Sequence, residues 1–418
     1  MLAFQTASRA WLTLAGLSLF LPADVRLGIW LPLHLAVAGA ASSAIFGAAQ
    51  LFSTTMTNTL DPPTRVVWTE FGLVNVGVAA IAIGRVAAWG WLVAAGGTAF
   101  VGAACLLAWV IRRAWTKGIN KRHPLPIYLY GFAVGCVIVG GLLGATLGSG
   151  RLTNANVYLA VKHAHMTLNV LGWVGVTIAG TLITLLPTTL RVKMPAWHGR
   201  AAAMSLGTGV VLLAAGFALR ITVVAAVGGL AWLAGAAGVL WMVTRVLRTQ
   251  RRWRAPISAR HLLAGVCWFA VGSVGLAWAA MRGVAGFDAF RTDFLVEFVL
   301  GWIVQTLLGA WLYLLPMQHP AHPDERRATL VALEFGGWVE LVALNVGVAL
   351  MAARGAGWVS GAAGWVGVVL ALAGGGIALA KAWTFPWLSA ALKRAPLGRR
   401  HLAWDPLQPR RDSGPGVG

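Results

Sequence analysis

KHAHMTLNVLGWVGVTIAGTLITLLPTT, residues 162–189, is the stretch that decides the class of fold. His163 and His165 stand before about twenty mostly apolar positions, which suffice for a helix that crosses roughly 30 Å of hydrocarbon and satisfies its own backbone hydrogen bonds. Ionisable side chains at such a place are costly unless they have a partner or a task. The stretch therefore predicts a membrane-spanning helix with a polar site at its mouth.

The rest of the chain has the same apolar character. Hydrophobic residues make up 58% of its 418 positions and charged residues 11%, and the mean hydropathy is +0.75. This balance excludes a soluble globular domain and predicts an all-α integral membrane protein. Twelve transmembrane helices are expected, with approximate cores at 4–22, 28–54, 66–84, 87–111, 126–148, 156–187, 201–219, 221–246, 262–281, 290–315, 329–352 and 358–392.

The two ends of the chain need separate treatment. Segment 4–22 is short enough for a signal peptide, but no small-x-small cleavage site follows it, so we expect a retained helix. Residues 393–418 mix prolines with arginines, which predicts a basic, disordered cytoplasmic tail. The expected organisation is one polytopic membrane domain over 1–392, followed by this tail.

The net charge of +21 is distributed unevenly along the chain. With twelve helices, the N-terminus, the connections after even-numbered helices and the C-terminal tail carry 25 of the 33 Lys and Arg, and the opposite face carries 8. The positive-inside rule then predicts that both termini are cytoplasmic, in a multi-pass protein of the bacterial cytoplasmic (plasma) membrane. Topology and contact with the lipid bilayer explain the basic charge, so we expect no nucleic-acid partner.

Self-comparison of the sequence indicates an internal repeat. Residues 68–79, WTEFGLVNVGVA, recur at 338–349 as WVELVALNVGVA, and Val170–Trp173 recurs as Val299–Trp302, each followed by glycine and Leu-Leu-Pro. Gly39 and Gly47 match Gly172 and Gly180 more loosely. These matches relate helices 2, 6 and 10, and separately 3 and 11. They predict three tandem four-helix units, about 1–116, 117–254 and 255–392, in a pseudo-threefold bundle.

Polar residues within the predicted helices form two sets. The outer ends of helices 2, 6 and 10 carry His34, then His163 and His165, then Asp293 and Glu297; the inner ends of helices 3 and 11 carry Glu70 with Asn75 and Glu340 with Asn345. A buried carboxylate can pass protons or act as a structural hydrogen-bond partner, and for Glu70 and Glu340 we favour the structural role. Asp293 and Glu297 can line a proton exit, bind a cation or pair with Arg291.

Two imidazoles from different helices at one depth can bind a metal ion or a haem iron. Residues two apart on a helix diverge by about 200°, so His163 and His165 do not both face one centre. We take His165 as the inward ligand opposite His34, with His163 as the other candidate. The remaining histidines are expected at solvated surfaces in or beside loops: His123, His198, His261, His319, His322 and His401.

The neighbouring glycines and the cysteines carry less information. Gly172 and Gly180 leave room for a flat cofactor or for a closely packed helix. The three cysteines, Cys105, Cys136 and Cys267, lie in predicted helices without a C-x-x-C spacing, which indicates packing rather than a disulfide or covalently attached haem.

Three four-helix arcs with histidines at the outer ends of helices 2 and 6 resemble the architecture of haem–copper oxidase subunit I. Within that group, H-A-H-x6-G-x7-G-T-L-x-T-L-L-P resembles the HAH segment of NnrS-type membrane proteins and the membrane portion fused to some bacterial multicopper oxidases. The resemblance covers most of the chain as architecture and is specific only over helices 2 and 6. It implies that His34 holds a low-spin haem and that His163 or His165 is linked with haem and copper. It also implies haem b and/or copper as cofactor, and a redox partner such as a cupredoxin-type protein.

The sequence departs from that pattern in three places. The oxidases have haem-binding histidines on helix 10, where this chain has Phe294, Glu297 and Phe298, and a copper-binding pair on helix 7, where residues 201–219 have no histidine. Gly172 follows His165 by seven positions, whereas NnrS-type members have glycine at five. Oxygen reduction at a binuclear centre is therefore not expected, and any relationship to NnrS is distant.

Two functional classes remain open at this point. In the first, the protein binds haem and/or copper and handles electrons, metal or a small gas such as nitric oxide. In the second, it is a cofactor-free transporter or channel in which the carboxylates guide protons or ions and the histidines tune gating. A scaffold partner that has lost its cofactor is a third possibility. The sequence does not decide whether the protein is an enzyme.

Overall fold

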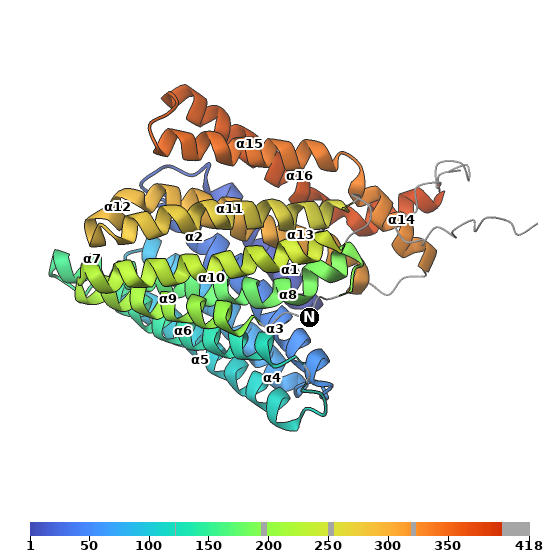
Figure 1. Cartoon of the computed structure of the whole chain (residues 1–418), viewed down its shortest axis with the longest axis horizontal. Coiled ribbons are helices and arrows are strands. Elements are labelled where there is room, and N and C mark those ends of the chain that lie inside the picture. Colours follow the sequence, from blue (N-terminus) through green and yellow to red (C-terminus); the bar gives the residue numbers. More distant parts are fainter. Residues whose placement is uncertain (122, 194–198, 250–254, 319–322, 395–418) are drawn as a thin grey trace, which may run out of the picture.

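The computed structural model describes the whole chain except residues 122, 194–198, 250–254, 319–322 and 395–418. The described part is all-helical, and its long helices run nearly parallel to one another (Figure 1). The elements are α1 (Leu2–Ser18), α2 (Trp30–His34), η1 (Leu35–Ala41), α3 (Ser42–Thr57), α4 (Thr64–Val86), α5 (Gly90–Lys117), α6 (Pro124–Gly148), α7 (Ala155–Met166), η2 (Thr167–Gly175), α8 (Val176–Leu190), α9 (Arg200–Leu219), α10 (Thr222–Arg248), α11 (Ile257–Ala280), α12 (Gly283–Phe294), η3 (Leu295–Val304), α13 (Gln305–Gln318), α14 (Pro323–Glu334), α15 (Gly337–Gly355) and α16 (Gly361–Arg394).

Many helices of the chain are long enough to span a membrane. Eleven helical segments of the described residues are long and apolar enough to cross a bilayer. The protein is therefore a multi-pass, all-α membrane protein, which confirms the predicted class. The first predicted helix also forms, as α1, which ends at Ser18 and packs against η1, α3 and α16. Most of the predicted tail lies outside the described residues, and α16 continues to Arg394.

The eleventh predicted span, 329–352, is interrupted. α14 ends at Glu334, and a new helix, α15, begins at Gly337. Between them Gly336 adopts a φ of +65°, a left-handed conformation that glycine reaches without steric cost and that commonly ends a helix. The spanning part is consequently shorter than expected, and the polar helix α14 stands apart from it.

Three of the spanning segments share an unusual backbone. Each starts as an α-helix, passes through a π-helical stretch and returns to α: α2–η1–α3, α7–η2–α8 and α12–η3–α13. The three π-helical stretches contact one another, which places them in the middle of the bundle. The sequence match between residues 170–173 and 299–302 lies within η2 and η3. π-Helical stretches are rare and occur frequently at functional sites.

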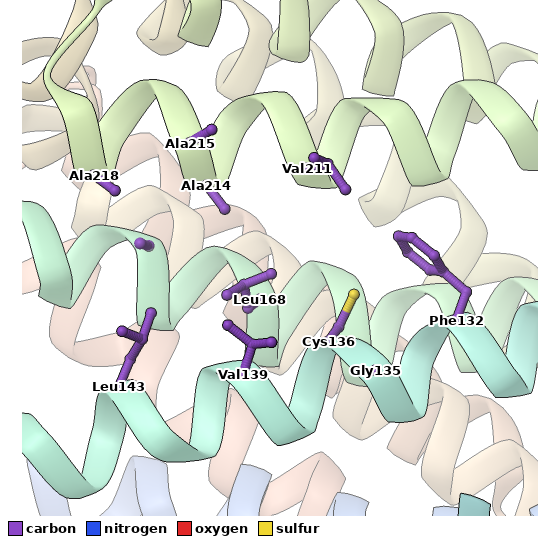
Figure 2. A pocket seen from close by; sticks show the side chains of 11 residues that line it. Phe132, Gly135, Cys136, Val139, Leu143, Leu168, Val211, Ala214, Ala215 and Ala218 are labelled. Carbon is purple, nitrogen blue, oxygen red and sulfur yellow. The ribbon is translucent and has the colours of Figure 1, made fainter.

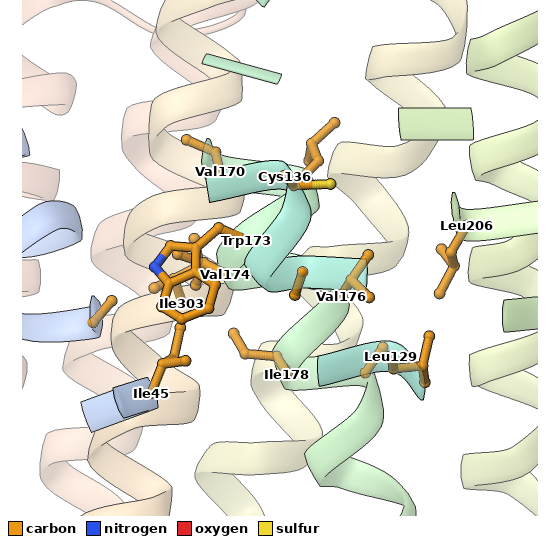
Figure 3. Packing of buried hydrophobic residues seen from close by; sticks show 14 of the residues in the cluster. Ile45, Leu129, Cys136, Val170, Trp173, Val174, Val176, Ile178, Leu206 and Ile303 are labelled. Carbon is orange, nitrogen blue, oxygen red and sulfur yellow. The ribbon is translucent and has the colours of Figure 1, made fainter. Parts of the chain in front are cut away.

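The core of the bundle surrounds the middle π-helical stretch. Figure 3 shows Trp173 and Val174 of η2 together with Ile45 of α3 and Ile303 of η3, all of them buried in one apolar cluster. Figure 1 shows the α15–α16 pair along one edge of the bundle and the α4–α5 pair along the opposite edge. Spanning segments with the most buried surface therefore lie inside, and hairpins facing lipid lie outside.

The outer helix pairs approach each other closely at glycines. A Cβ atom added to Gly77 would lie 2.9 Å from the carbonyl oxygen of Gly96, and one added to Gly347 would lie 2.6 Å from that of Gly367. Both Gly77 and Gly347 belong to the repeated N-V-G-V-A sequence. Small residues at helix contacts are the usual means of packing within a bilayer. This part of the repeat thus specifies the α4–α5 and α15–α16 hairpins.

Buried tryptophans tie distant parts of the chain together. Trp173 Nε1 donates to Ser42 Oγ (2.9 Å), Trp232 Nε1 donates to Ser273 Oγ (3.0 Å), and Trp311 Nε1 donates to Gln5 Oε1 (2.7 Å). Each bond joins ranges that the sequence assigns to different four-helix units. An indole N–H inside a bilayer needs such an acceptor. The bonds therefore fix how the three ranges face one another.

Candidate functional site

His34 is the last residue of α2, at the point where the π-helical stretch η1 begins. Its ring stacks on the indole of Trp30, with centroids 3.9 Å apart and planes 22° apart. Its Nδ1 lies 2.8 Å from the carbonyl oxygen of Trp30. Because a carbonyl can only accept, this hydrogen bond places the ring proton on Nδ1 and leaves the lone pair on Nε2.

His165 lies two residues before η2 begins and is oriented in a similar way. Its Nδ1 lies 2.8 Å from the carbonyl oxygen of Gly140 on α6 and donates to it, while the Asn169 amide donates to the backbone carbonyl oxygen of His165 itself (2.8 Å). Gly144, also on α6, makes room for the ring, since a Cβ atom there would lie 2.6 Å from its Cε1. Gly140 thus provides the hydrogen-bond acceptor for this imidazole and Gly144 provides the space for its ring. As in His34, Nε2 is the nitrogen without a hydrogen bond.

The two rings meet. Their centroids are 6.4 Å apart and their planes differ by 13°. We call His34 and His165 the histidine pair, and the end of the bundle that contains them the histidine end. Within the described part of the chain, neither Nε2 atom forms a hydrogen bond, and both rings remain partly accessible. The structure therefore brings together the two residues that the sequence singled out as facing ligands.

His163 does not join this pair. It is fully buried on another side of α7, between Phe217 of α9 and Phe287 of α12, at centroid distances of 5.9 and 5.0 Å. Its Nε2 lies 3.5 Å from an oxygen of Asp288. The separation of His163 from His165 agrees with the wide angle between residues two apart on a helix.

Asp293 and Glu297 occupy the third segment with a π-helical stretch. Glu297 lies within η3 and is 8% exposed, and Asp293 contacts Gly355 of α15. Arg291 pairs with Asp288 (3.1 Å). Among the described residues, Asp293 Oδ1 and Glu297 Oε2 are buried without a hydrogen-bond partner. No histidine accompanies them in η3, as the sequence indicated.

The opposite end of the bundle contains a buried ionic cluster, and we call it the glutamate end. Glu340 of α15 is fully buried, with Lys381 Nζ of α16 at 2.8 Å and His261 Nε2 of α11 at 3.5 Å. The expected surface position of His261 is wrong, because α11 already begins at Ile257 and carries this histidine into the bundle, where it packs against Gly309. Exposed His123 agrees with its expected surface position, whereas His198, His319, His322 and His401 lie outside the described residues.

Glu70 has a simpler environment at the same end. It is fully buried, and its Oε1 accepts a hydrogen bond from Gln50 Nε2 at 2.6 Å. The asparagines of the repeated sequence also have partners: Asn75 accepts from Trp11 Nε1 (2.7 Å) and Asn345 accepts from Trp268 Nε1 (2.8 Å). The motif residues thus contact neighbouring helices.

The small residues after His165 serve close helix packing. A Cβ atom added to Gly172 would lie 2.7 Å from Cys136 Cβ, and one added to Gly180 would lie 3.2 Å from Leu129 Cβ, both on α6. All three cysteines are free thiols. Within the described ranges, no group of three or more His, Cys, Asp or Glu side chains can hold a metal ion. A cofactor at the histidine end would therefore be held by two protein ligands.

Comparison of the sequence with protein-family models and with curated proteins gives no match. No protein-family model matches the chain, and no curated protein is significantly similar to it in sequence. Function is therefore argued from the geometry of the site.

Sequence patterns left two features of these sites unnoticed. His261 was hidden because its helix was expected to start at 262, although Pro256 marks the true beginning of α11. Trp30 was one of 22 tryptophans, and only its position one turn before His34 distinguishes it.

Proposed function

We propose that this protein is a haem-binding integral membrane protein in which His34 and His165 would hold a haem b. The observation that carries the proposal is the 6.4 Å separation of their ring centroids. Two metal–nitrogen bonds of about 2.0 Å, together with the distance from each nitrogen to its ring centre, give a centroid separation of about 6 Å. The pair is spaced as two imidazoles that share one metal ion.

The hydrogen bonds of the two rings support the same conclusion. A histidine that binds a metal through Nε2 usually donates its Nδ1 proton to a carbonyl or carboxylate, which fixes the ring and raises the basicity of Nε2. His34 does this with Trp30 and His165 does it with Gly140. Both rings are thus oriented by backbone carbonyl groups of α2 and α6, which supports the proposal.

The number of ligands favours haem over copper. Structural zinc sites use four protein ligands, and the common copper sites use three or more. The histidine pair offers two, and no third His, Cys, Asp or Glu joins it among the described residues. Two are sufficient for haem because the macrocycle provides the other four donor atoms. Copper remains the alternative that metal analysis distinguishes.

Bis-histidine ligation favours electron transfer as the activity. A haem held by these two histidines would supply a one-electron redox centre. The contribution of the chain is to hold the two imidazoles, to cover His34 with the Trp30 indole and to exclude water with the buried residues around η1 and η2. The electron partner would be a redox protein at the histidine end.

The wider setting forms part of the proposal. We infer twelve spanning helices in three four-helix units, an arrangement like that of haem–copper oxidases and NnrS-type proteins. We also infer that the protein lies in a bacterial plasma membrane with both termini on the cytoplasmic side. Three mutually contacting π-helical stretches, one per unit, support the threefold arrangement. The Trp–Asn hydrogen bonds at Asn75 and Asn345 support the equivalence of the first and last units.

The decisive experiment is a visible spectrum and a metal analysis of the protein purified in detergent from haem-replete cells. We expect a Soret band and about one iron per chain, both lost in His34→Ala and in His165→Ala. His163→Ala is the matched control because it removes a buried histidine two positions away, and it should keep the spectrum. A colourless wild-type protein without metal would contradict the proposal, as would equal loss in all three variants.

A second candidate function rests on a different observation. Asp293 and Glu297 place two buried carboxyl oxygens without partners beside η3, an arrangement that suits proton or cation passage. Proton and sodium flux into vesicles that contain the purified protein tests this function. A flux that Glu297→Gln abolishes, in a protein without haem, would replace the haem proposal by the transporter.

A further inference from the structure

A groove lies between α6, α7 and α9, with a volume of about 480 Å³ (Figure 2). Its walls consist of apolar side chains and glycine, with Phe132, Cys136 and Leu143 on the α6 side, Leu168 of η2 at the floor, and Val211 and Ala218 on the α9 side. Figure 2 shows the sulfur of Cys136 directed toward α9. The groove is therefore a hydrophobic recess within the spanning part of the protein.

The corresponding place is filled by tryptophan in the first and last units. A Cβ atom added to Gly39 of η1 would lie 2.8 Å from Trp11 Cγ, and one added to Gly301 of η3 would lie 2.5 Å from Trp268 Cγ. Each indole donates its N–H to an asparagine, Asn75 or Asn345. In both units a tryptophan of the first helix thus lies over the π-helical glycine and reaches the third helix.

The middle unit lacks both partners. Its π-helical glycine, Gly172, faces Cys136 of α6, with 2.7 Å between the added Cβ and Cys136 Cβ, and Val210 of α9 at 3.1 Å. Cys136 stands where the other units have tryptophan. The position of the asparagine belongs to Gly207, because Gly207 comes two residues before Gly209, which packs against the backbone of the next helix as Gly77 and Gly347 do. Since Cys is much smaller than Trp, the space that an indole fills elsewhere stays open here. Cys136 lines the groove at this place.

The groove opens sideways. Val139 and Val211 on its two rims are each 50% exposed, although both lie near the middle of spanning helices. At that depth the surroundings are hydrocarbon, and a recess without polar groups offers water no hydrogen-bonding partners. The natural occupant is therefore a hydrocarbon chain of the bilayer.

Length and charge identify the kind of lipid. From Phe132 to Leu143 the groove follows twelve residues of α6, or about 17 Å at 1.5 Å per residue. That is about half of a 30 Å hydrocarbon layer, the reach of one acyl chain from the interface to the midplane. Arg220 follows the groove residue Ala218 by two positions, and Arg151 follows the end of α6 closely. Both arginines are exposed at the end where a headgroup would lie.

We propose that this groove binds one acyl chain of an anionic phospholipid whose phosphate contacts Arg220 and Arg151. The site is separate from the histidine pair and does not depend on whether haem is bound. It predicts that one anionic lipid stays with the protein through purification, while lipids elsewhere on the surface exchange.

The test uses the tryptophan arrangement of the other units. The double variant Cys136→Trp/Gly207→Asn gives the middle unit the pair found in the first and last, and Trp268→Cys/Asn345→Gly opens an equivalent recess in the last. Each protein is delipidated in detergent and incubated with phosphatidylglycerol, and the retained lipid is counted by native mass spectrometry. We expect one retained lipid in the wild type, at least tenfold less in the first variant, and a second lipid in the reverse variant.

Two further measurements keep the test decisive. If the double variant fails to fold, Ala215→Phe fills the groove from the α9 wall and should lower retention in the same way. Arg220→Gln should lower the preference for phosphatidylglycerol over phosphatidylcholine. Equal retention in the wild type and in the filled variants would overturn the site, and equal retention of the two lipids by the wild type would overturn the anionic headgroup.

Discussion

The two ends of this protein differ in the partners of their polar side chains. At the histidine end, His34 and His165 face each other, each with one nitrogen bound to a backbone carbonyl and the other free of hydrogen bonds to the described residues. At the glutamate end, Glu340 lies against Lys381 and Glu70 accepts from Gln50. At the first end the Nε2 atoms of both rings have no hydrogen-bond partner in the described part of the chain. At the second, each motif glutamate has a side-chain partner from another helix, although Glu70 Oε2 is buried without one.

This difference separates a binding site from a structural one. A buried charge with a matched partner stabilises the packed helices, and removing only the partner is strongly destabilising. A pair of neutral rings with free Nε2 atoms contributes little to folding until a ligand joins them. Substitutions at the two ends should therefore differ in whether stability or binding is lost.

The largest effect is expected for Lys381→Met. The substitution leaves the Glu340 carboxylate buried without its cation, which should lower the free energy of unfolding by about 3–5 kcal/mol. Thermal unfolding in detergent, followed by size-exclusion chromatography, measures the change. The double variant Lys381→Met/Glu340→Gln should recover most of the loss. If it is as unstable as the single variant, the ion pair is not the cause.

A smaller loss is expected for Gln50→Leu. Glu70 Oε1 then loses its donor, and an unsatisfied buried acceptor costs roughly 1–3 kcal/mol. The same unfolding assay applies, with the exposed Thr98→Val as a control for loss of a lone polar group. Equal stability of Gln50→Leu and wild type would show that Glu70 has another partner.

The histidine end should tolerate substitution better. In protein prepared without cofactor, His165→Ala removes one hydrogen bond to Gly140, which corresponds to a loss on the order of 1 kcal/mol. The difference from wild type should increase when haem is added, since only the wild type gains stability from binding. A variant as unstable as Lys381→Met would mean that the pair is structural.

The smallest effect concerns Glu334, which lies in α14 outside the spanning segments. Burial raises the pKa of its carboxyl, and nearby Glu340 raises it further, against the opposing effects of the Ile257 N–H, Arg260 and Lys381. The folded state therefore holds the proton more tightly than the unfolded state, and stability falls as pH rises through the raised pKa. In Glu334→Gln the melting temperature should depend less on pH between pH 4 and pH 8 than in the wild type. An unchanged dependence would assign it to another group.

The sequence predicted the fold class and the residues of the histidine pair, because both depend on local patterns. Apolar length predicts spanning helices, and the sequence match around Gly172 and Gly301 predicted that these segments are equivalent. The angular argument that chose His165 over His163 needed only helix geometry. The π-helical backbone at both positions has no such signature, since the hydrogen-bond shift depends on how three segments pack against one another.

Other features depend on partners far away in the chain. The motif glutamates were visible in the sequence, but Lys381 and Gln50 became their partners only through helix packing. The same is true of Trp11 and Trp268, whose separation from Asn75 and Asn345 differs by thirteen residues between the two units. A constant repeat offset would have exposed the match, and the differing offset concealed it. The groove at Cys136 remained unnoticed for this reason.

The contact between the two extremes of the chain has a consequence for biosynthesis. The guanidinium of Arg9, in the first helix, donates to the carbonyl oxygen of Ala382 and lies over the Trp383 ring, whose N–H donates to Thr13. These partners are translated more than 370 residues later. Until then the arginine has no acceptor in α16, and its charge must be kept hydrated at the membrane surface. Docking of the first helix against α16 is therefore a late step, and a chain truncated before residue 382 lacks this contact while α1 keeps its packing against η1 and α3.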